Sequence, residues 1–206
     1  MNARAQPSAA HAAVLIFLIL LLPPVRHALE SSMTAQMLLQ IPLLVAAGLL
    51  LSRATPAWLD AALADWDWQG IAGLVMATFA AAMWMLPRAL DASVSETAMA
   101  TAKYLSVPLL IGLPFGLSWM RMGFIVRGVF LIELIATCFR MGWLYLLWPD
   151  RLCNNYLLDD QQRLGKCLVA IGVALLLWTA AKLLWGNLSG VAGLPDTATR
   201  HRRVEG

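Results

Sequence analysis

Residues 33–52 read MTAQMLLQIPLLVAAGLLLS, and this stretch decides the fold class. It contains no charged side chain. A helix rises about 1.5 Å per residue, so about 20 residues cross a hydrocarbon core of about 30 Å. In lipid every backbone N–H and C=O must be paired within its own segment, and an apolar run of this length therefore predicts a transmembrane helix. Pro42 predicts a kink in it, because proline removes one backbone hydrogen bond.

Five further apolar runs indicate the same class of protein. They cover residues 12–25, 70–88, 97–120, 123–148 and 164–185. The first run is short and ends in two prolines, so the hydrophobic region of a signal peptide is the alternative interpretation; the lack of a small-residue cleavage motif favours a retained span. Pro108 and Pro114 predict a second kinked helix. Together the runs predict an all-α, polytopic integral membrane bundle of about six transmembrane helices.

The composition excludes an ordinary soluble domain. Of 206 residues, 60% are apolar and only 13% are charged, and the mean hydropathy is +0.70. Soluble domains carry about 25% charged residues. The net charge of +3 is small and lies partly in the stretch 200–203, so no nucleic-acid partner is expected. Three cysteines are too few and too scattered for a disulfide framework or a zinc finger.

The apolar runs divide the chain into a polar N-terminal segment over 1–11, the transmembrane bundle over 12–186 and a mobile basic tail over 187–206. Apolar residues at helical spacing within 53–67 predict a short helix lying in the membrane interface. Residues 149–163 are predicted to form the longest polar loop. More lysines and arginines fall on the side of the membrane that holds the N-terminus than on the other. The positive-inside rule therefore predicts a bacterial inner-membrane protein whose N-terminus faces the cytoplasm.

Four methionines are candidate ligands for copper(I). An up-and-down bundle brings one end of every span to a common side, and Met33, Met37, Met85 and Met99 all lie toward that side. Thioethers suit Cu(I), and Met33 and Met37, four residues apart, share one helix face. Methionine is also a common gap-filling residue of hydrophobic cores, and that is the alternative.

Three ionisable residues lie deep within predicted spans: Lys103, Glu133 and Arg140. Such groups are costly in lipid and usually face the bundle interior, where they pair. Glu133 and Arg140 are two helical turns apart on one face, and Lys103 is another possible partner for Glu133. The group is interpreted either as a proton or ion relay or as a structural ion pair that fixes helix register. The lack of a second acid within the spans favours the structural pair.

No enzymatic activity is predicted. The histidines are His11, His27 and His201, none of them in the middle of a span, so a haem held by two histidines is not expected. The sequence contains no metalloprotease, phosphate-loop or serine-hydrolase motif.

The segment from Ser32 to Trp119 carries a recognisable framework. Ser32-Met33-Thr34-Ala35-Gln36-Met37-Leu38-Leu39 opens a span that continues through Pro42-Leu43-Leu44 to Gly48, and Trp84-Met85-Leu86-Pro87 is followed by Asp91-Ala92. This pattern resembles the CtaG-like family of bacterial cytochrome c oxidase assembly factors. The family has H-M-x-x-H-M-L-L at the first site, W-H-x-P at the second, and a further pair of histidines four apart in its next span. The framework residues that agree are Pro42, Gly48, Trp84, Pro87 and Asp91.

Every histidine of the family pattern is replaced here. The corresponding residues are Ser32, Gln36, Met85, Met99 and Lys103. The resemblance implies a role beside a respiratory oxidase, because the family is associated with copper delivery to that enzyme. Serine and glutamine are poor soft-metal ligands, so only a site built on methionine would still hold Cu(I).

The sequence therefore predicts a non-enzymatic accessory protein of the inner membrane. It would act in cytochrome c oxidase biogenesis or copper handling, with a degenerate or methionine-based metal site. Expected partners are the lipid bilayer, oxidase subunits and a periplasmic copper chaperone. Two alternatives remain open: a small transporter or channel that uses Lys103, Glu133 and Arg140, and a membrane scaffold without a ligand.

Overall fold

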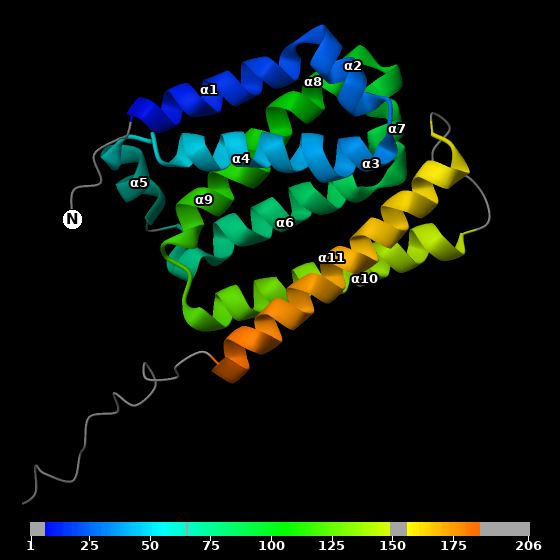
Figure 1. Cartoon of the computed structure of the whole chain (residues 1–206). Helices are drawn as coiled ribbons and strands as arrows, with labels where there is room; N and C mark the ends of the chain where they lie inside the picture. Colours follow the sequence, from blue (N-terminus) through cyan, green and yellow to red (C-terminus); the bar gives the residue numbers. More distant parts are fainter. Residues whose placement is uncertain (1–6, 65, 149–155, 186–206) are drawn as a thin grey trace, which may run out of the picture.

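The computed structural model describes residues 7–64, 66–148 and 156–185, and within these ranges the chain is helical and contains no β-strand. The predicted all-α class is confirmed (Figure 1). In chain order the elements are α1 (Pro7–Leu21), α2 (Pro23–Glu30), α3 (Met33–Ala35), the π-helical η1 (Gln36–Gln40), α4 (Ile41–Ser52), α5 (Ala57–Ala64), the 3₁₀ turn η2 (Trp68–Gly70), α6 (Ile71–Met85), α7 (Pro87–Ser95), α8 (Thr97–Ser106), the π-helical η3 (Val107–Gly112), α9 (Leu113–Trp119), α10 (Phe124–Leu147) and α11 (Leu158–Trp185).

Four helical stretches of the described chain are long and apolar enough to cross a membrane: Met33–Ser52, Trp68–Met85, Thr97–Trp119 and Leu158–Leu184. The number is five if the bent pair α1–α2 forms one span. The protein is thus a helical membrane protein, but the predicted count of six is not confirmed. The remaining long helix, α10, has 24 residues and carries three ionisable side chains spread along its length, and it is not among these candidate spans.

Both predicted kinks take the form of π-helical turns. Residues 36–40 precede Pro42, and residues 107–112 contain Pro108 and precede Pro114. Proline has no N–H, and its ring crowds the carbonyl four residues earlier, so the preceding turn widens. The two wide turns lie within continuous helices, one from α3 to α4 and one from α8 to α9.

Helix α4 is the centre of the bundle. It packs against α1 on one side and against η3 and α9 on the other, and α6 also packs against η3 and α9 (Figure 1). Helix α4 approaches η3 very closely, because a Cβ atom on Gly48 would lie 2.2 Å from the carbonyl oxygen of Pro108 and 2.8 Å from Cα of Gly112. The framework glycine Gly48 is therefore required for this helix contact.

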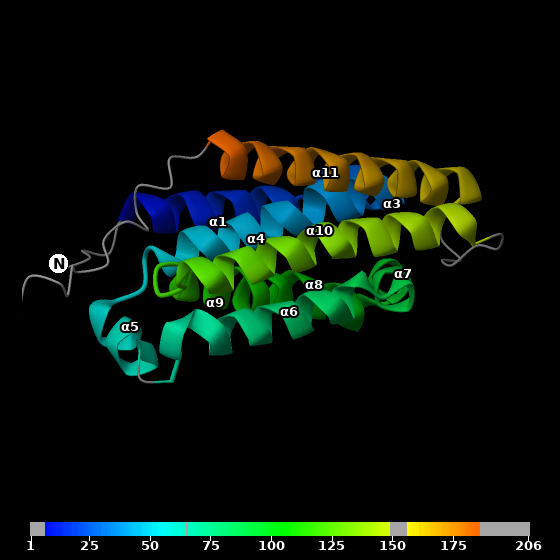
Figure 2. The ribbon, with the colours of Figure 1, turned by 90° about the horizontal axis from the view of Figure 1, so that it is seen from below.

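Helices α10 and α11 form an antiparallel pair that runs along the bundle (Figures 1 and 2). Glycines again permit the close approach. A Cβ atom on Gly142 would lie 3.0 Å from the carbonyl oxygen of Gly165, and one on Gly172 would lie 3.3 Å from Cβ of Cys138. The pair meets the rest of the molecule where α11 packs on α3.

Three predicted boundaries are wrong. Helix α1 already begins at Pro7, within the predicted polar segment 1–11. It ends at Leu21, and α2 continues after a bend of 71°, because a residue before proline avoids the α conformation and Leu22 is extended. Helix α11 begins at Leu158, inside the predicted loop 149–163, where Asp159 and Asp160 favour a helix N-terminus.

The predicted short helix within 53–67 is confirmed as α5 (Ala57–Ala64), while its place in the membrane interface stays a prediction. Asp67 ties this region to the bundle: it accepts hydrogen bonds from the Ser118 hydroxyl at 2.6 Å and from the Gly73 N–H at 3.0 Å. Arg121 bridges Asp67 and Asp60. The predicted tail over 187–206 lies outside the described residues.

Exposed tryptophans mark both ends of the bundle. Trp58, Trp66 and Trp68 lie beside or within α5 and η2, at the end that faces left in Figure 1, and all are highly exposed. Trp143 and Trp148 lie at the C-terminal end of α10, at the opposite end, and are also exposed. Tryptophan concentrates at membrane–water interfaces, so these two groups are consistent with the surfaces of a bilayer.

Candidate functional site: a buried polar cluster and an exposed charged face

The five residues that the resemblance aligns with histidines all lie toward one end of the molecule, formed by α2, α3, α7 and the start of α11 (Figure 1). Ser32, Gln36, Met85, Met99 and Lys103 come from the start of α3, η1, the end of α6 and the first turns of α8. The predicted common side is therefore present. Their contacts at this end, however, are not those of a set of metal ligands.

Lys103 is fully buried, and its ammonium group binds two oxygens. Nζ donates to Glu30 Oε1 at 2.8 Å and to Gln40 Oε1 at 3.0 Å. The second carboxylate oxygen of Glu30 accepts from Nε of Arg26 at 2.9 Å. The prediction that Lys103 is a partner for Glu133 is wrong. The carboxylate that pairs with Lys103 is that of Glu30 on α2, and the 71° bend of the N-terminal helix pair brings α2 beside α8.

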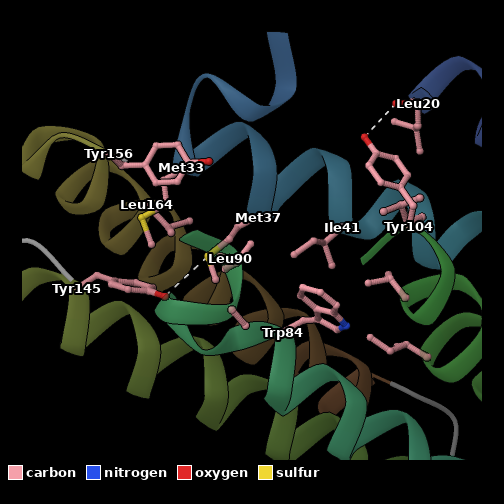
Figure 3. Close-up of a cluster of buried hydrophobic side chains, with 14 of the residues drawn as sticks. Leu20, Met33, Met37, Ile41, Trp84, Leu90, Tyr104, Tyr145, Tyr156 and Leu164 are labelled. Atoms are coloured by element: carbon pink, nitrogen blue, oxygen red, sulfur yellow. Dashed lines mark hydrogen bonds between the residues drawn. The ribbon is translucent and has the colours of Figure 1, made fainter. Parts of the chain in front are cut away.

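Tyr104 and Gln40 extend this cluster into the core. The amide nitrogen of Gln40 donates to the Tyr104 hydroxyl at 2.7 Å, and that hydroxyl donates to the Leu20 carbonyl oxygen at 3.1 Å (Figure 3). The Lys103 ammonium also lies 5.4 Å from the centroid of the Tyr104 ring, within the range of a cation–π contact. One polar cluster thus joins α1, α2, η1 and α8.

Gln36 and Ser32, at the first pair of histidine positions, are also engaged. Gln36 Nε2 donates to the Ser93 hydroxyl at 3.1 Å, and its Oε1 accepts from the Tyr156 hydroxyl. The Ser32 hydroxyl donates to Asp160 Oδ1 at 2.9 Å. The side chains at these positions are used to hold α3, α7 and α11 together.

The methionines are core residues in this structure. Met33 and Met37 are buried, and the Tyr145 hydroxyl lies 3.9 Å from the Met37 sulfur (Figure 3). Met85 and Met99 are partly buried and pack against the same hydrophobic cluster. A cation at position 103 and engaged polar groups at positions 32 and 36 do not fit a copper site at the family's ligand positions. Within the described ranges, no group of three or more His, Cys, Asp and Glu residues is placed to hold a metal ion.

The ion pair between Glu133 and Arg140 is confirmed, but its predicted direction into the bundle is wrong. Arg140 donates to Glu133 Oε1, and Thr137 hydrogen-bonds to both partners. The two charged side chains are 53% and 62% exposed. Both side chains therefore lie on the surface of the molecule. The buried Lys103 bonds to Glu30 and Gln40 instead of to this pair.

The charged pair belongs to an open face on α10, which we call the α10 face. It consists of exposed residues at helical spacing: Ile125, Val129, Ile132, Glu133, Arg140, Trp143 and Leu147. Gly128 lies beside it, and a Cβ atom there would meet nothing within 4 Å. Gly112 and Gly116, by contrast, lie against other helices of the bundle.

Sequence reasoning missed Glu30 and Asp160, the two carboxylates that organise the buried end. Glu30 could have been identified from the sequence, because a lysine deep in a span requires a counter-charge. Glu30 is an acid on the same side of the predicted bundle as Lys103. Asp160 had no such signal, since its partners lie more than 120 residues earlier in the chain.

The fold and these sites define the class: a helical membrane protein with a hydrogen-bonded polar end and a charged outer helix face. Comparison with known proteins adds no family, because no family model, no curated protein and no solved structure matches the chain.

Proposed function

We propose that this protein is a non-enzymatic accessory protein of the bacterial inner membrane, with its N-terminus in the cytoplasm, that acts in biogenesis of a terminal oxidase. In this proposal the α10 face docks against a transmembrane helix of an oxidase subunit. The observation that carries the proposal is the exposed ion pair between Glu133 and Arg140 near the middle of α10.

The pair has no stable place in contact with lipid. A charged side chain at the centre of a transmembrane helix costs about 2.5–3.5 kcal/mol on insertion scales, and such residues nearly always face protein or water. Helix α10 runs along the membrane-spanning α11, so we take the two as a hairpin across the bilayer. The guanidinium of Arg140 has five donors, and a partner helix with hydroxyl, amide or carboxylate groups would satisfy those left open.

The oxidase context rests on the sequence framework alone, and the structure gives the framework residues packing roles. Gly48 allows the close backbone contact between α4 and η3, and the buried Trp84 donates to the Ser106 hydroxyl at 2.8 Å. Pro87 begins α7, the short helix at the buried end. These residues therefore serve the fold, which explains how the framework is kept while the ligand positions change.

The transporter alternative is less favoured. It needs Lys103, Glu133 and Arg140 to line one path, whereas Lys103 is enclosed by Glu30 and Gln40, and the other two lie on the outer surface. A docking protein needs no such path.

Replacing both charges on the α10 face is expected to abolish docking without loss of the protein. In a deletion strain complemented with Glu133→Leu/Arg140→Leu, oxidase activity of the membranes should fall to the level of the deletion strain, while the abundance of the variant stays at the wild-type level. Leu183→Ala, at an exposed apolar position of α11, is the control and should behave like wild type. Photo-cross-linking from position 132, followed by identification of the captured oxidase subunit, gives the direct readout.

Three results would contradict the proposal. They are unchanged oxidase activity in the deletion strain, full complementation by the double variant, or cross-links from position 132 that join only two copies of this chain. The last result would assign the α10 face to self-association.

Copper content is expected to be independent of the methionines. Metal analysis of protein purified under reducing conditions should give the same copper content for wild type, Met85→Ala and Met99→Ala, because both methionines pack against the hydrophobic core and the polar side chains of Gln36 and Lys103 are already hydrogen-bonded. Copper present in wild type and lost in both variants would show a methionine-based site instead.

A further inference from the structure

A pocket of about 420 Å³ opens between α3 and the first turns of α11. The residues lining it are Ser32, Thr34, Asp160, Arg163, Lys166 and Cys167. It lies at the end of the bundle marked by Trp143 and Trp148, where a membrane interface is expected.

The pocket has an excess of available positive charge. The single carboxylate, Asp160, is already committed to α3: Oδ1 accepts from the Ser32 and Thr34 hydroxyls at 2.9 and 3.1 Å, and Oδ2 accepts from the Met33 N–H. Arg163 and Lys166 are exposed, and neither forms an ion pair with any residue in the described part of the chain. They are three residues apart on α11 and share one face.

The same face of α11 continues as an apolar stripe toward the middle of the helix. Arg163, Lys166, Ala170, Val173 and Leu177 follow one another at intervals of three and four residues, so they form one line along the helix. Val173 and Leu177 are 42% and 64% exposed. Two basic groups at the interface, followed by an open apolar stripe, match the two ends of an anionic lipid.

We propose that this pocket binds the phosphate headgroup of an anionic phospholipid, whose acyl chains lie along the α11 stripe. Arg163 and Lys166 contact the phosphate oxygens, and the inference does not depend on the docking function of α10. Free inorganic phosphate carries the same oxyanion, but it has no acyl chain that could contact the apolar stripe.

Native mass spectrometry of the full chain from mixed phosphatidylglycerol and phosphatidylcholine nanodiscs tests the proposal. Wild type should retain phosphatidylglycerol preferentially. Each of Arg163→Gln and Lys166→Gln should weaken this retention about fivefold, since a basic residue near an anionic lipid contributes about 1 kcal/mol. Arg88→Gln is the matched control, because it removes an exposed charge of α7 at the same end but outside the pocket, and it should retain phosphatidylglycerol as wild type does.

Maleimide labelling of Cys167 locates the lipid. In a Cys138→Ala/Cys153→Ala background, labelling of Cys167 should be slower in phosphatidylglycerol than in phosphatidylcholine nanodiscs, and Lys166→Gln should remove the difference. Equal retention of both lipids by wild type would contradict the proposed lipid site. An equal loss of phosphatidylglycerol retention in Arg88→Gln and Lys166→Gln would contradict it as well. Protection of Cys167 by inorganic phosphate in phosphatidylcholine nanodiscs would reassign it to a free anion.

Discussion

Glu30→Gln is expected to cause the largest loss of stability of any single substitution in the buried polar cluster. The change keeps the shape of the side chain but leaves the ammonium group of Lys103, which has no exposed surface, without its counter-charge. Removing one partner of a buried ion pair costs about 3–5 kcal/mol. Reversible unfolding of the purified protein in detergent, followed by tryptophan fluorescence, measures the free-energy change.

The double variant Glu30→Gln/Lys103→Met separates charge from packing. Replacing both partners of a buried pair is often nearly neutral, so the double variant should regain most of the lost stability. Asp60→Asn serves as the control, because it removes an acid from the half-exposed pair with Arg121, outside the membrane-spanning helices, and should alter stability by about 1 kcal/mol or less. A Glu30→Gln protein as stable as wild type would show that Lys103 does not depend on this carboxylate.

Gly48→Ala is expected to separate α4 from η3 and to destabilise the bundle by about 3 kcal/mol. The added Cβ would overlap backbone atoms of Pro108 and Gly112, which cannot turn aside as a flexible side chain does. Overpacking of this kind costs about 1–3 kcal/mol, and more where backbone must move. The same unfolding measurement in detergent gives the value.

Gly128→Ala is the matched control for this prediction. It makes the same chemical change in α10, where the new methyl group meets nothing within 4 Å. Alanine has the higher helix propensity, so the variant should be as stable as wild type or more stable by up to about 1 kcal/mol. Equal stability of the two alanine variants would contradict the close contact between α4 and η3.

Much of the fold follows from local sequence. The uncharged run at 33–52 predicts its helix because a membrane leaves few other ways to pair the backbone. Pro42 and Pro108 mark the two widened turns, and the helical spacing within 53–67 marks α5. The bend at Leu22 was also visible in principle, since Pro23 restricts the residue before it.

The candidate sites follow from sequence only in part. Lys103 and Glu30 are separated by 73 residues, and Tyr156 and Gln36 by 120 residues, so no local pattern pairs them. The pair between Glu133 and Arg140 was predictable, because both residues lie on one helix. Its outward direction was not, because that depends on which face of α10 packs against α11.

The membrane arrangement itself is tested most directly by single-cysteine accessibility in intact cells and inverted vesicles. Cysteines placed at Ser31, at the end of α2, and at Ser95, at the end of α7, should react with a membrane-impermeant maleimide from the same compartment. A cysteine at Arg53, at the opposite end of α4, should react from the other compartment. Labelling of positions 31 and 95 from opposite compartments, or of all three from one, would contradict a bundle that crosses the bilayer with its polar cluster at a single surface.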